Sequence, residues 1–218
     1  MASDVRLVRM LVATLALAFV IHQAYATFPL HLSRSGYTPV IYGSLMSLNG
    51  LLIIAIELWV TTVTRRLPAL IAIAIGMTLN GIGFGAIGIA GSVGALAVTV
   101  VIWTFGEMVF SPVGAAYIAD IAPVDLRGRY QAAWAFTFSL GLMLAPIGGT
   151  LLYSRRPSLL WVTCLCLCLA AAALMASAWL GERRSLGREE TEPERGAERL
   201  AIASSRPLIA DEPAAPVD

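Results

Sequence analysis

One acidic side chain stands inside an otherwise apolar stretch of the chain: Glu107, in the segment WTFGEMVFSPVGAAY. Thr104 precedes it by three residues and Ser111 follows it by four, so all three share one helical face. A charged group inside a bilayer is costly and usually faces protein or a water-filled cavity. Two interpretations follow. Glu107 takes up and releases a proton in such a cavity, or it pairs with Arg65 or Arg66 and locks helices together; the second is favoured.

Other polar side chains occur in the first two apolar segments. His22 and Gln23 can relay protons or contact a substrate, or they can form hydrogen bonds between helices. Tyr42 and Asn49 are seven residues apart, so they share a face and either line a polar cavity or bridge helices. Glu57 lies shortly before a pair of arginines, and a local ion pair is favoured for it over transport chemistry.

A short charged loop separates the Glu107 segment from the next apolar segment. It contains Asp120, Asp125, Arg127 and Arg129. A loop at the membrane surface between two spanning helices explains this pattern, because its arginines remain in the headgroup region.

The elements that carry these residues are expected to be membrane-spanning helices. Hydrophobic residues make up 58% of the 218 residues and charged residues 13%, compared with about 25% charged residues in soluble domains. A spanning helix needs roughly 20 apolar residues. We predict an all-α polytopic membrane protein with a leader (1–7), a six-helix membrane domain (8–180) and a disordered polar tail (181–218). The predicted helices are 8–30, 40–60, 68–90, 94–116, 130–153 and 158–180.

The distribution of arginine predicts the orientation. With the N-terminus inside, eight arginines lie on inner segments and three on outer links. Positive charge favours the cytoplasmic side, so both termini are expected in the cytoplasm and the protein in the plasma membrane. The net charge of +1 argues against a nucleic-acid partner, which requires a basic face.

The sequence carries no pattern typical of an enzyme or a metal centre. It has no nucleophile with a positioned base, no His/Cys/Asp metal spacing and no phosphate-binding glycine loop. Cys164, Cys166 and Cys168 alternate along one segment, and residues two apart on a helix point about 200° apart, so they cannot converge on one metal. We expect no catalytic activity, metal or cofactor.

Several stretches resemble the C-terminal six-helix half of a major facilitator superfamily transporter of the drug:proton antiporter type. They are QAYATFPLHL (23–32), YGSLMSLNGLLIIAIELWVTTVTRR (42–66), FGEMVFSPVGAAYIADIAPVDLRGRY (105–130) and GLMLAPIGGTLL (141–152). The third is the most specific. The loop after the second helix keeps only Arg65 and Arg66 of the family's Gly-x-x-x-Asp-Arg-x-Gly-Arg-Arg pattern.

The resemblance implies secondary-active transport by alternating access. The expected cargo is a small organic or drug-like molecule, exported with protons as the candidate coupling ion, and membrane lipid surrounds the helices. The implied pathway residues are His22, Gln23, Tyr42, Asn49, Glu107 and Trp134. The implied conformational latch, which would exchange partners between inward- and outward-facing states, comprises Arg65, Arg66, Asp120, Asp125, Arg127 and Arg129.

The family resembled here has twelve helices, whereas six are predicted in this chain. A truncated product, a split transporter whose N-terminal half is a separate chain, and a pair of identical halves all fit this difference. Truncation or a split gene is favoured. The alternative function is a membrane remnant or scaffold that transports nothing.

Overall fold

The structure is a computed structural model that describes residues 4–204, with side chains described as far as Arg184. The chain divides into two units, residues 1–179 and 180–218, and each is considered by itself. The described residues form helices and no strand, which confirms the predicted all-α class.

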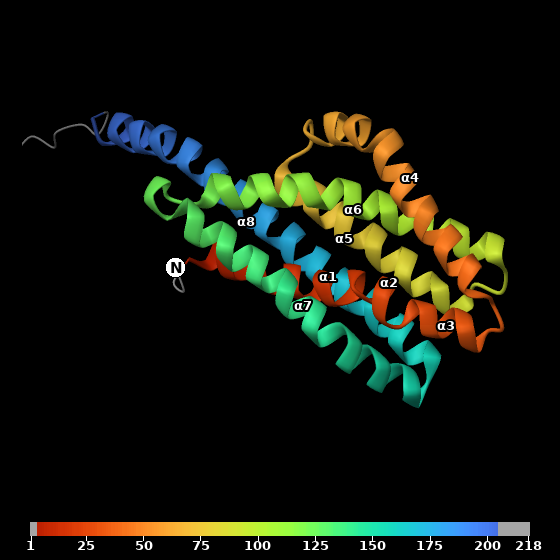
Figure 1. Ribbon diagram of the computed structural model, residues 1–218. Coiled ribbons are helices and arrows are strands. Elements are labelled where there is room, and N and C mark those ends of the chain that lie inside the picture. The colour runs from red at the N-terminus through yellow and green to blue at the C-terminus, as the bar shows by residue number, and fades with distance from the viewer. Residues whose placement is uncertain (1–3, 205–218) are drawn as a thin grey trace, which may run out of the picture. The chain divides into compact units, whose positions relative to one another are not determined.

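Helices follow one another directly along the chain, joined by short connections (Figure 1). The α-helices are α1 (Val5–Ile21), α2 (Gln23–Ala26), α3 (Phe28–Arg34), α4 (Pro39–Thr64), α5 (Ala69–Ala86), α6 (Val93–Ile121), α7 (Arg127–Arg155) and α8 (Pro157–Ser204). Two short 3₁₀-helices, η1 (Ile87–Ile89) and η2 (Val124–Leu126), follow α5 and α6.

Six of the described segments are long and apolar enough to cross a membrane, which confirms the predicted number of spans. They are Val5–Ala26, Pro39–Thr64, Ala69–Ile89, Val93–Ile121, Val124–Arg155 and Pro157–Arg184. Each overlaps one predicted helix, so the protein is a multi-pass membrane protein.

The first span is not the continuous helix that the sequence suggested. It breaks at His22 and again at Thr27, which separates α1, α2 and α3. Gln23 bonds to the carbonyl oxygen of Phe19 and to the Thr27 hydroxyl, so polar side chains compete with the backbone at both breaks. Pro29 follows in the first turn of α3, where it has no N–H to donate.

The predicted charged loop from 120 to 129 is shorter than expected. Asp120 lies within the last turn of α6, and Arg127 and Arg129 lie in the first turn of α7. The true connection holds Pro123, which restricts the residue before it to extended backbone, so α6 ends there.

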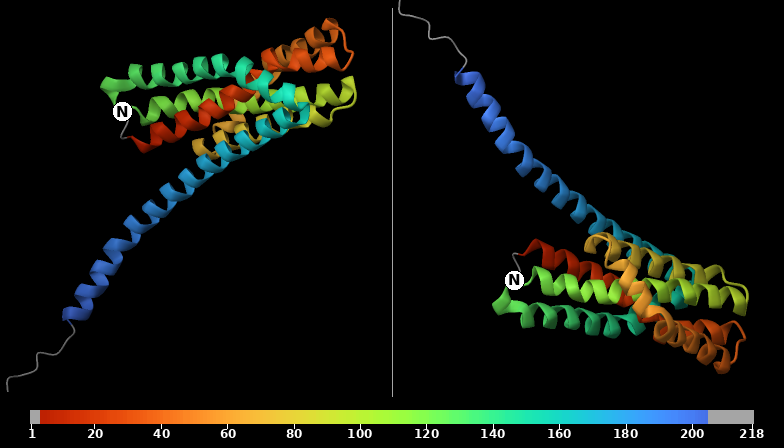
Figure 2. Two further views of the ribbon diagram at one scale, coloured as in Figure 1. Left: turned by 90° about the horizontal axis from the view of Figure 1, so that it is seen from below. Right: turned by 90° about the horizontal axis from the view of Figure 1, so that it is seen from above.

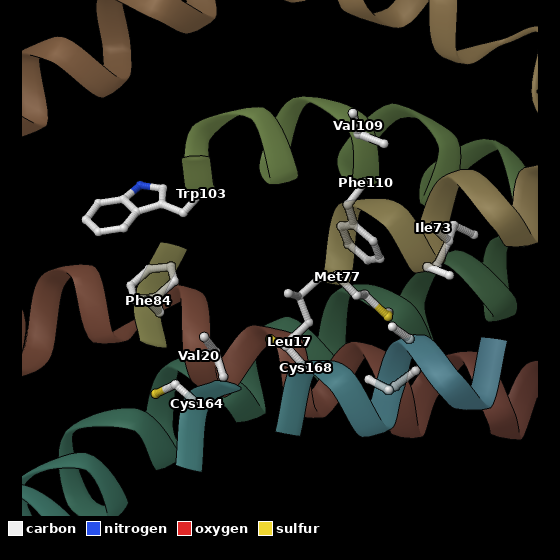
Figure 3. Packing of buried hydrophobic residues seen from close by; sticks show 14 of the residues in the cluster. Leu17, Val20, Ile73, Met77, Phe84, Trp103, Val109, Phe110, Cys164 and Cys168 are labelled. Atoms are coloured by element: carbon white, nitrogen blue, oxygen red, sulfur yellow. The ribbon is translucent and has the colours of Figure 1, made fainter. Parts of the chain in front are cut away.

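Glycines let the helices approach closely. A Cβ atom on Gly83 of α5 would lie 2.7 Å from the backbone nitrogen of Trp103 in α6. A Cβ atom on Gly81 would lie 2.7 Å from the Cys168 Cβ atom of α8. The ring of Phe84 stacks on Trp103 at 4.4 Å, and Cys164 and Cys168 are buried in the same core (Figure 3). α5 is therefore packed between α6 and α8.

α1 and α7 form a second close pair: they lie side by side in Figure 1, and Figure 2 shows them approaching each other toward the end of α1 away from the N-terminus. A Cβ atom on Gly141 would lie 2.5 Å from Ala18 Cβ, and one on Gly148 would lie 2.9 Å from the Phe19 ring. Small residues thus allow close contact between α5 and its neighbours α6 and α8, and between α1 and α7, as is common in membranes.

The backbone of the second unit is helical as far as Ser204, where we expected mostly disorder from 181 onward. Glu, Arg, Ala and Leu dominate this segment and all favour helix, which accounts for the difference. The last part of the expected tail, 205–218, lies outside the described residues.

Candidate functional site

Glu107 lies where α4 and α6 meet, and its hydrogen-bond partner is an amide. Asn49 Nδ2 donates to Glu107 Oε2 at 3.1 Å and to Thr104 Oγ1 at 2.9 Å. The Thr104 hydroxyl in turn donates to the carbonyl oxygen of Val100 at 2.6 Å. One asparagine of α4 therefore bridges two residues that share a face of α6, as their spacing predicted.

The favoured interpretation of Glu107 as the partner of Arg65 or Arg66 is not what the structure shows. Among the described residues, no arginine lies within ion-pair distance of Glu107, and Asn49 takes that place. Arg65 instead lines a separate cavity of about 220 Å³ at the end of α4, together with Thr61, Tyr117 and Asp120.

A cavity of about 180 Å³ opens beside the Glu107 carboxyl. Its polar lining consists of Glu57, Glu107 and Ser111, and its apolar lining of Ile21, Ile53, Met108 and Phe138. Two carboxyl groups from neighbouring helices thus share one small space within the membrane domain. Residues that supply only oxygen atoms suit a proton or a hard cation better than a soft metal.

Glu57 is the site residue that sequence reasoning assigned elsewhere. We had interpreted it through its nearness to Arg65 and Arg66, yet it lies in the same cavity as Glu107. A signal was present: Asn49, Ile53 and Glu57 are four residues apart in turn, which is the spacing of one helical stripe.

Two tyrosines extend the polar face from Glu107 toward α2. The Tyr25 side chain is 64% exposed and interacts electrostatically with Glu107. The Tyr42 hydroxyl donates to the carbonyl oxygen of Ala24 at 3.2 Å, and Tyr42 interacts electrostatically with Tyr25. The ring of Tyr42 is held by an edge contact with Phe28 at 6.1 Å.

The side chains of His22 and Gln23 form hydrogen bonds within the helix bundle. Gln23 is fully buried; its Nε2 donates to the carbonyl oxygens of Phe19 at 3.0 Å and Ala145 at 3.2 Å. A Cβ atom on Gly149 would collide with the Gln23 side chain, so α7 packs directly on it. His22 Nδ1 lies 2.6 Å from the carbonyl oxygen of Ala18 in its own helix.

Trp134 belongs to α7, and its side chain packs toward Gly114 of α6 rather than beside Glu107. Its ring packs edge-on against Phe138 at 5.1 Å, and Phe138 in turn lines the Glu107 cavity. In the part of the chain that the structure describes, the Trp134 indole nitrogen has no hydrogen-bond partner.

The predicted latch residues do not form one cluster. Arg65 and Asp120 line the cavity at the end of α4, while Arg66, Asp125, Arg127 and Arg129 are exposed. Among the described residues, none of these six is seen in an ion pair with another.

A different contact ties this end of the bundle together, and sequence reasoning missed it. The Tyr130 hydroxyl donates to Asp4 Oδ2 at 2.7 Å, which joins the start of α7 to the start of α1. Asp4 also caps α1 by accepting from the backbone of Arg6 and Leu7. The hydrogen bond from Tyr130 is the main cause that lowers the pKa of Asp4 below its ordinary value.

Within the described residues, no group of three or more His, Cys, Asp or Glu side chains is placed to hold a metal ion. The polar groups described at this position are the Asn49, Glu57 and Glu107 side chains and the tyrosines beside them.

Known proteins resemble this chain in sequence and fold. It is 24% identical over 131 residues to an uncharacterized MFS-type transporter, YqjV, of Bacillus subtilis (strain 168), which covers 58% of this chain and 32% of the relative. It is also 24% identical over 106 residues to a Na(+), Li(+), K(+)/H(+) antiporter of Planococcus maritimus, covering 49% of this chain and 25% of the relative. The chain thus spans about a third or less of the curated relatives that it matches.

A solved structure shares the fold. The crystal structure of a POT family transporter in complex with a thioalcohol conjugated peptide superposes with a TM-score of 0.64 at 16% identity, covering 81% of this chain and 40% of that one. The sequence model described as Major Facilitator Superfamily matches residues 10–213, nearly the whole chain. This chain belongs to the Major Facilitator Superfamily.

Proposed function

We propose that this chain takes part in secondary-active transport of a small organic molecule, with Glu107 as the group that carries the coupling proton. The superfamily and the transporter relatives support transport rather than an enzymatic role. The observation that carries the proposal is the Glu107 carboxyl, which lies beside a cavity and bonds to a neutral amide instead of an arginine.

The neutral partner matters for the chemistry of Glu107. If an arginine held the carboxyl, taking up a proton would leave a buried cation unpaired. The Asn49 amide can donate to either form of the carboxyl, so protonation changes the charge of the site without orphaning another charge. A carboxyl of this kind can exchange a proton while the helices around it rearrange.

The tyrosines beside Glu107 support an organic cation as the transported species. Tyr25 is exposed next to the carboxyl, and Tyr42 lies close to Tyr25. An aromatic face attracts a cation within about 6 Å of its centre, and a carboxylate supplies the opposite charge. Proton and substrate would then compete for Glu107, which is the basis of exchange transport.

The chain would act with a second six-helix unit, supplied by another part of a longer protein, by a separate chain or by a second copy. Superfamily transporters bind substrate at the midplane between two halves. That second unit would cover the open side of the polar face and so complete the binding site; the face consists of Tyr25, Tyr42, Asn49 and Glu107. Location in the plasma membrane with both termini in the cytoplasm, and export as the direction, belong to the same proposal.

A second candidate is exchange of an alkali cation for a proton. Glu57, Glu107 and Ser111 offer oxygen atoms to one small cavity, and hard cations prefer such ligands. The relative from Planococcus maritimus is named as an antiporter of Na(+), Li(+) and K(+) for H(+).

Proteoliposomes containing the chain together with a candidate N-terminal six-helix unit test these proposals. A proton gradient should drive movement of a fluorescent organic cation; movement of Na⁺ or K⁺ alone would favour the second candidate, and no movement of either would favour a scaffold. Glu107→Gln should abolish the dependence on the proton gradient, while Glu182→Gln, which changes an acid of the second unit, should keep it. Unchanged proton dependence in Glu107→Gln rules out the coupling role.

A further inference from the structure

A cluster of aromatic and basic side chains joins α3 to the α7–α8 connection. His31 Nδ1 lies 3.0 Å from the Tyr153 hydroxyl oxygen. The His31 ring also makes edge contacts with Tyr153 at 5.9 Å and with Trp161 at 5.4 Å. Arg34, one turn further along α3, places its guanidinium 5.2 Å from the centre of the Tyr153 ring. In Figure 1, α3 and the end of α7 lie at the same end of the bundle.

The aromatic residues of this cluster are more deeply buried than His31. Tyr153 is 2% exposed and Trp161 is 1% exposed, while His31 is half-buried between them. A Cβ atom on Gly88 would lie 3.1 Å from Trp161, so the indole cannot retreat toward η1. The Tyr153 and Trp161 rings therefore hold His31 in one position. If His31 became charged, the Trp161 indole could not move away from it toward η1.

The charged residues in the segments that meet at His31 are all basic. Arg34 belongs to the same helix, Arg155 and Arg156 follow Tyr153 at the end of α7, and the titratable tyrosines are Tyr37 and Tyr153. The start of α8 contributes Trp161 and the buried Cys164. The sequence has no acidic residue between Asp4 and Glu57 or between Asp125 and Glu182, so α3, α7 and the part of α8 before Glu182 offer no carboxylate.

We propose that His31 is a protonation-controlled latch: its neutral ring holds α3 against α7 and α8, and its protonated ring releases α3. A half-buried cation without a counter-ion loses part of its hydration, and the attraction of the aromatic rings offsets only part of that cost. Protonation makes both ring nitrogens of His31 donors, so Nδ1 can no longer accept a hydrogen bond from the Tyr153 hydroxyl.

The sign of the pH dependence follows from burial. Burial lowers the pKa of His31 below the ordinary histidine value of 6.5. The released state holds His31 in water and binds the proton more readily, so acidification below about pH 6.5 favours release. One proton per opening changes the ratio of open to closed molecules by at most about tenfold per pH unit. This switch does not depend on the proposed transport function.

Two measurements on the full chain in nanodiscs test the latch. The chain has only two histidines, so ¹³C-histidine labelling gives two NMR signals that His22→Gln and His31→Gln assign. Spin labels at the exposed positions Ser33 and Ser158, in a background with the three cysteines replaced by alanine, report the separation of α3 and α8. We expect this distance to lengthen between pH 8 and pH 5 with the midpoint of the His31 titration.

The variants separate the latch from a general effect of acid. His31→Gln keeps a neutral hydrogen-bonding side chain and should remain closed throughout, whereas His22→Gln should open as the wild type does. Tyr153→Phe keeps the ring contacts but loses the hydrogen bond, so its opening should shift to higher pH. Opening that persists in His31→Gln overturns the proposal. So does a distance that stays constant while His31 titrates, or a His31 that never titrates down to pH 5.

Discussion

Glu107 shows how one neighbouring residue changes what a buried carboxyl can do. An arginine partner would fix it in the charged form, because removing that charge would strand the arginine. Asn49 offers a hydrogen bond without a charge, and Glu57 lines the same cavity. The residue types in the cavity therefore suit a group that changes protonation state.

Asp4 provides a prediction at the same scale that does not involve transport. The Tyr130 hydrogen bond lowers the pKa of Asp4 from its ordinary value of 3.8. A lowered pKa in the folded state stabilises the protein above the unfolded value, and this stabilisation is lost as pH falls through the folded value. Below about pH 4, the apparent Tm of the wild type should therefore fall more steeply than that of Tyr130→Phe.

Controls for Asp4 separate its charge from its capping role. Asp4→Asn keeps a good helix cap and should lose only the stabilisation that depends on the carboxylate charge, while Asp4→Ala also loses the cap and should cost about 1 kcal/mol more. If Tyr130→Phe and the wild type lose stability in parallel through the acid range, the hydrogen bond does not control the pKa of Asp4.

The helices form two closely packed groups, and the contacts that define them are made by small residues. α5 is held between α6 and α8, and α1 is held against α7, with glycines at each crossing. Where backbones approach this closely, a single methyl group has no space. α4 differs, because its glycines meet open space.

A pair of glycine substitutions tests this view of the packing. Gly83→Ala places a Cβ atom 2.7 Å from backbone of α6 and should destabilise the bundle by about 1–3 kcal/mol. Gly50→Ala on α4 meets nothing within 4 Å and should be neutral or stabilise by up to about 1 kcal/mol. Thermal unfolding of both variants in the same detergent gives the comparison. Equal effects would mean that the α5–α6 crossing tolerates a wider separation.

The sequence predicts the spans because the bilayer fixes their length, and an apolar segment of that length has few alternatives. It also predicts the shared face of Thr104 and Glu107, since helical spacing alone decides that. The breaks at His22 and Thr27 depend on which backbone group a polar side chain finds, so composition does not reveal them.

Contacts between helices are the part that spacing cannot supply. Gln23 looked like a pathway residue because it is polar, but Gly149 of α7 allows it to be buried and fully bonded. The Asp4–Tyr130 bond joins residues 126 positions apart, and no local pattern indicates such a pair. The sequence therefore predicts which site residues share a face of one helix, but not which residues of other helices contact them.

At the scale of the whole molecule, α4 is the helix least covered by its own chain. Only 6% of its apolar window is buried, compared with 61% for α5. Its outer face carries a hollow lined by Val40, Gly43, Ser44, Ser47, Leu48 and Leu51. Lipid alone would cover large apolar side chains well, whereas glycine and serine on a helix surface favour close contact with another helix.

If the proposed second six-helix unit packs on this face, filling the hollow should disturb assembly and leave the isolated chain intact. Gly43→Trp adds a large ring at a position where a Cβ atom would meet nothing within 4 Å, so the free energy of unfolding of the chain alone should stay within about 0.5 kcal/mol of the wild type. Co-purification with the candidate N-terminal unit should fall sharply, and transport with it. Val162→Trp, on an exposed position of α8, is the matched control and should assemble normally. Equal behaviour of the two variants would place lipid, not protein, against α4, and the second unit would then have to cover Tyr25 and Glu107 from another side.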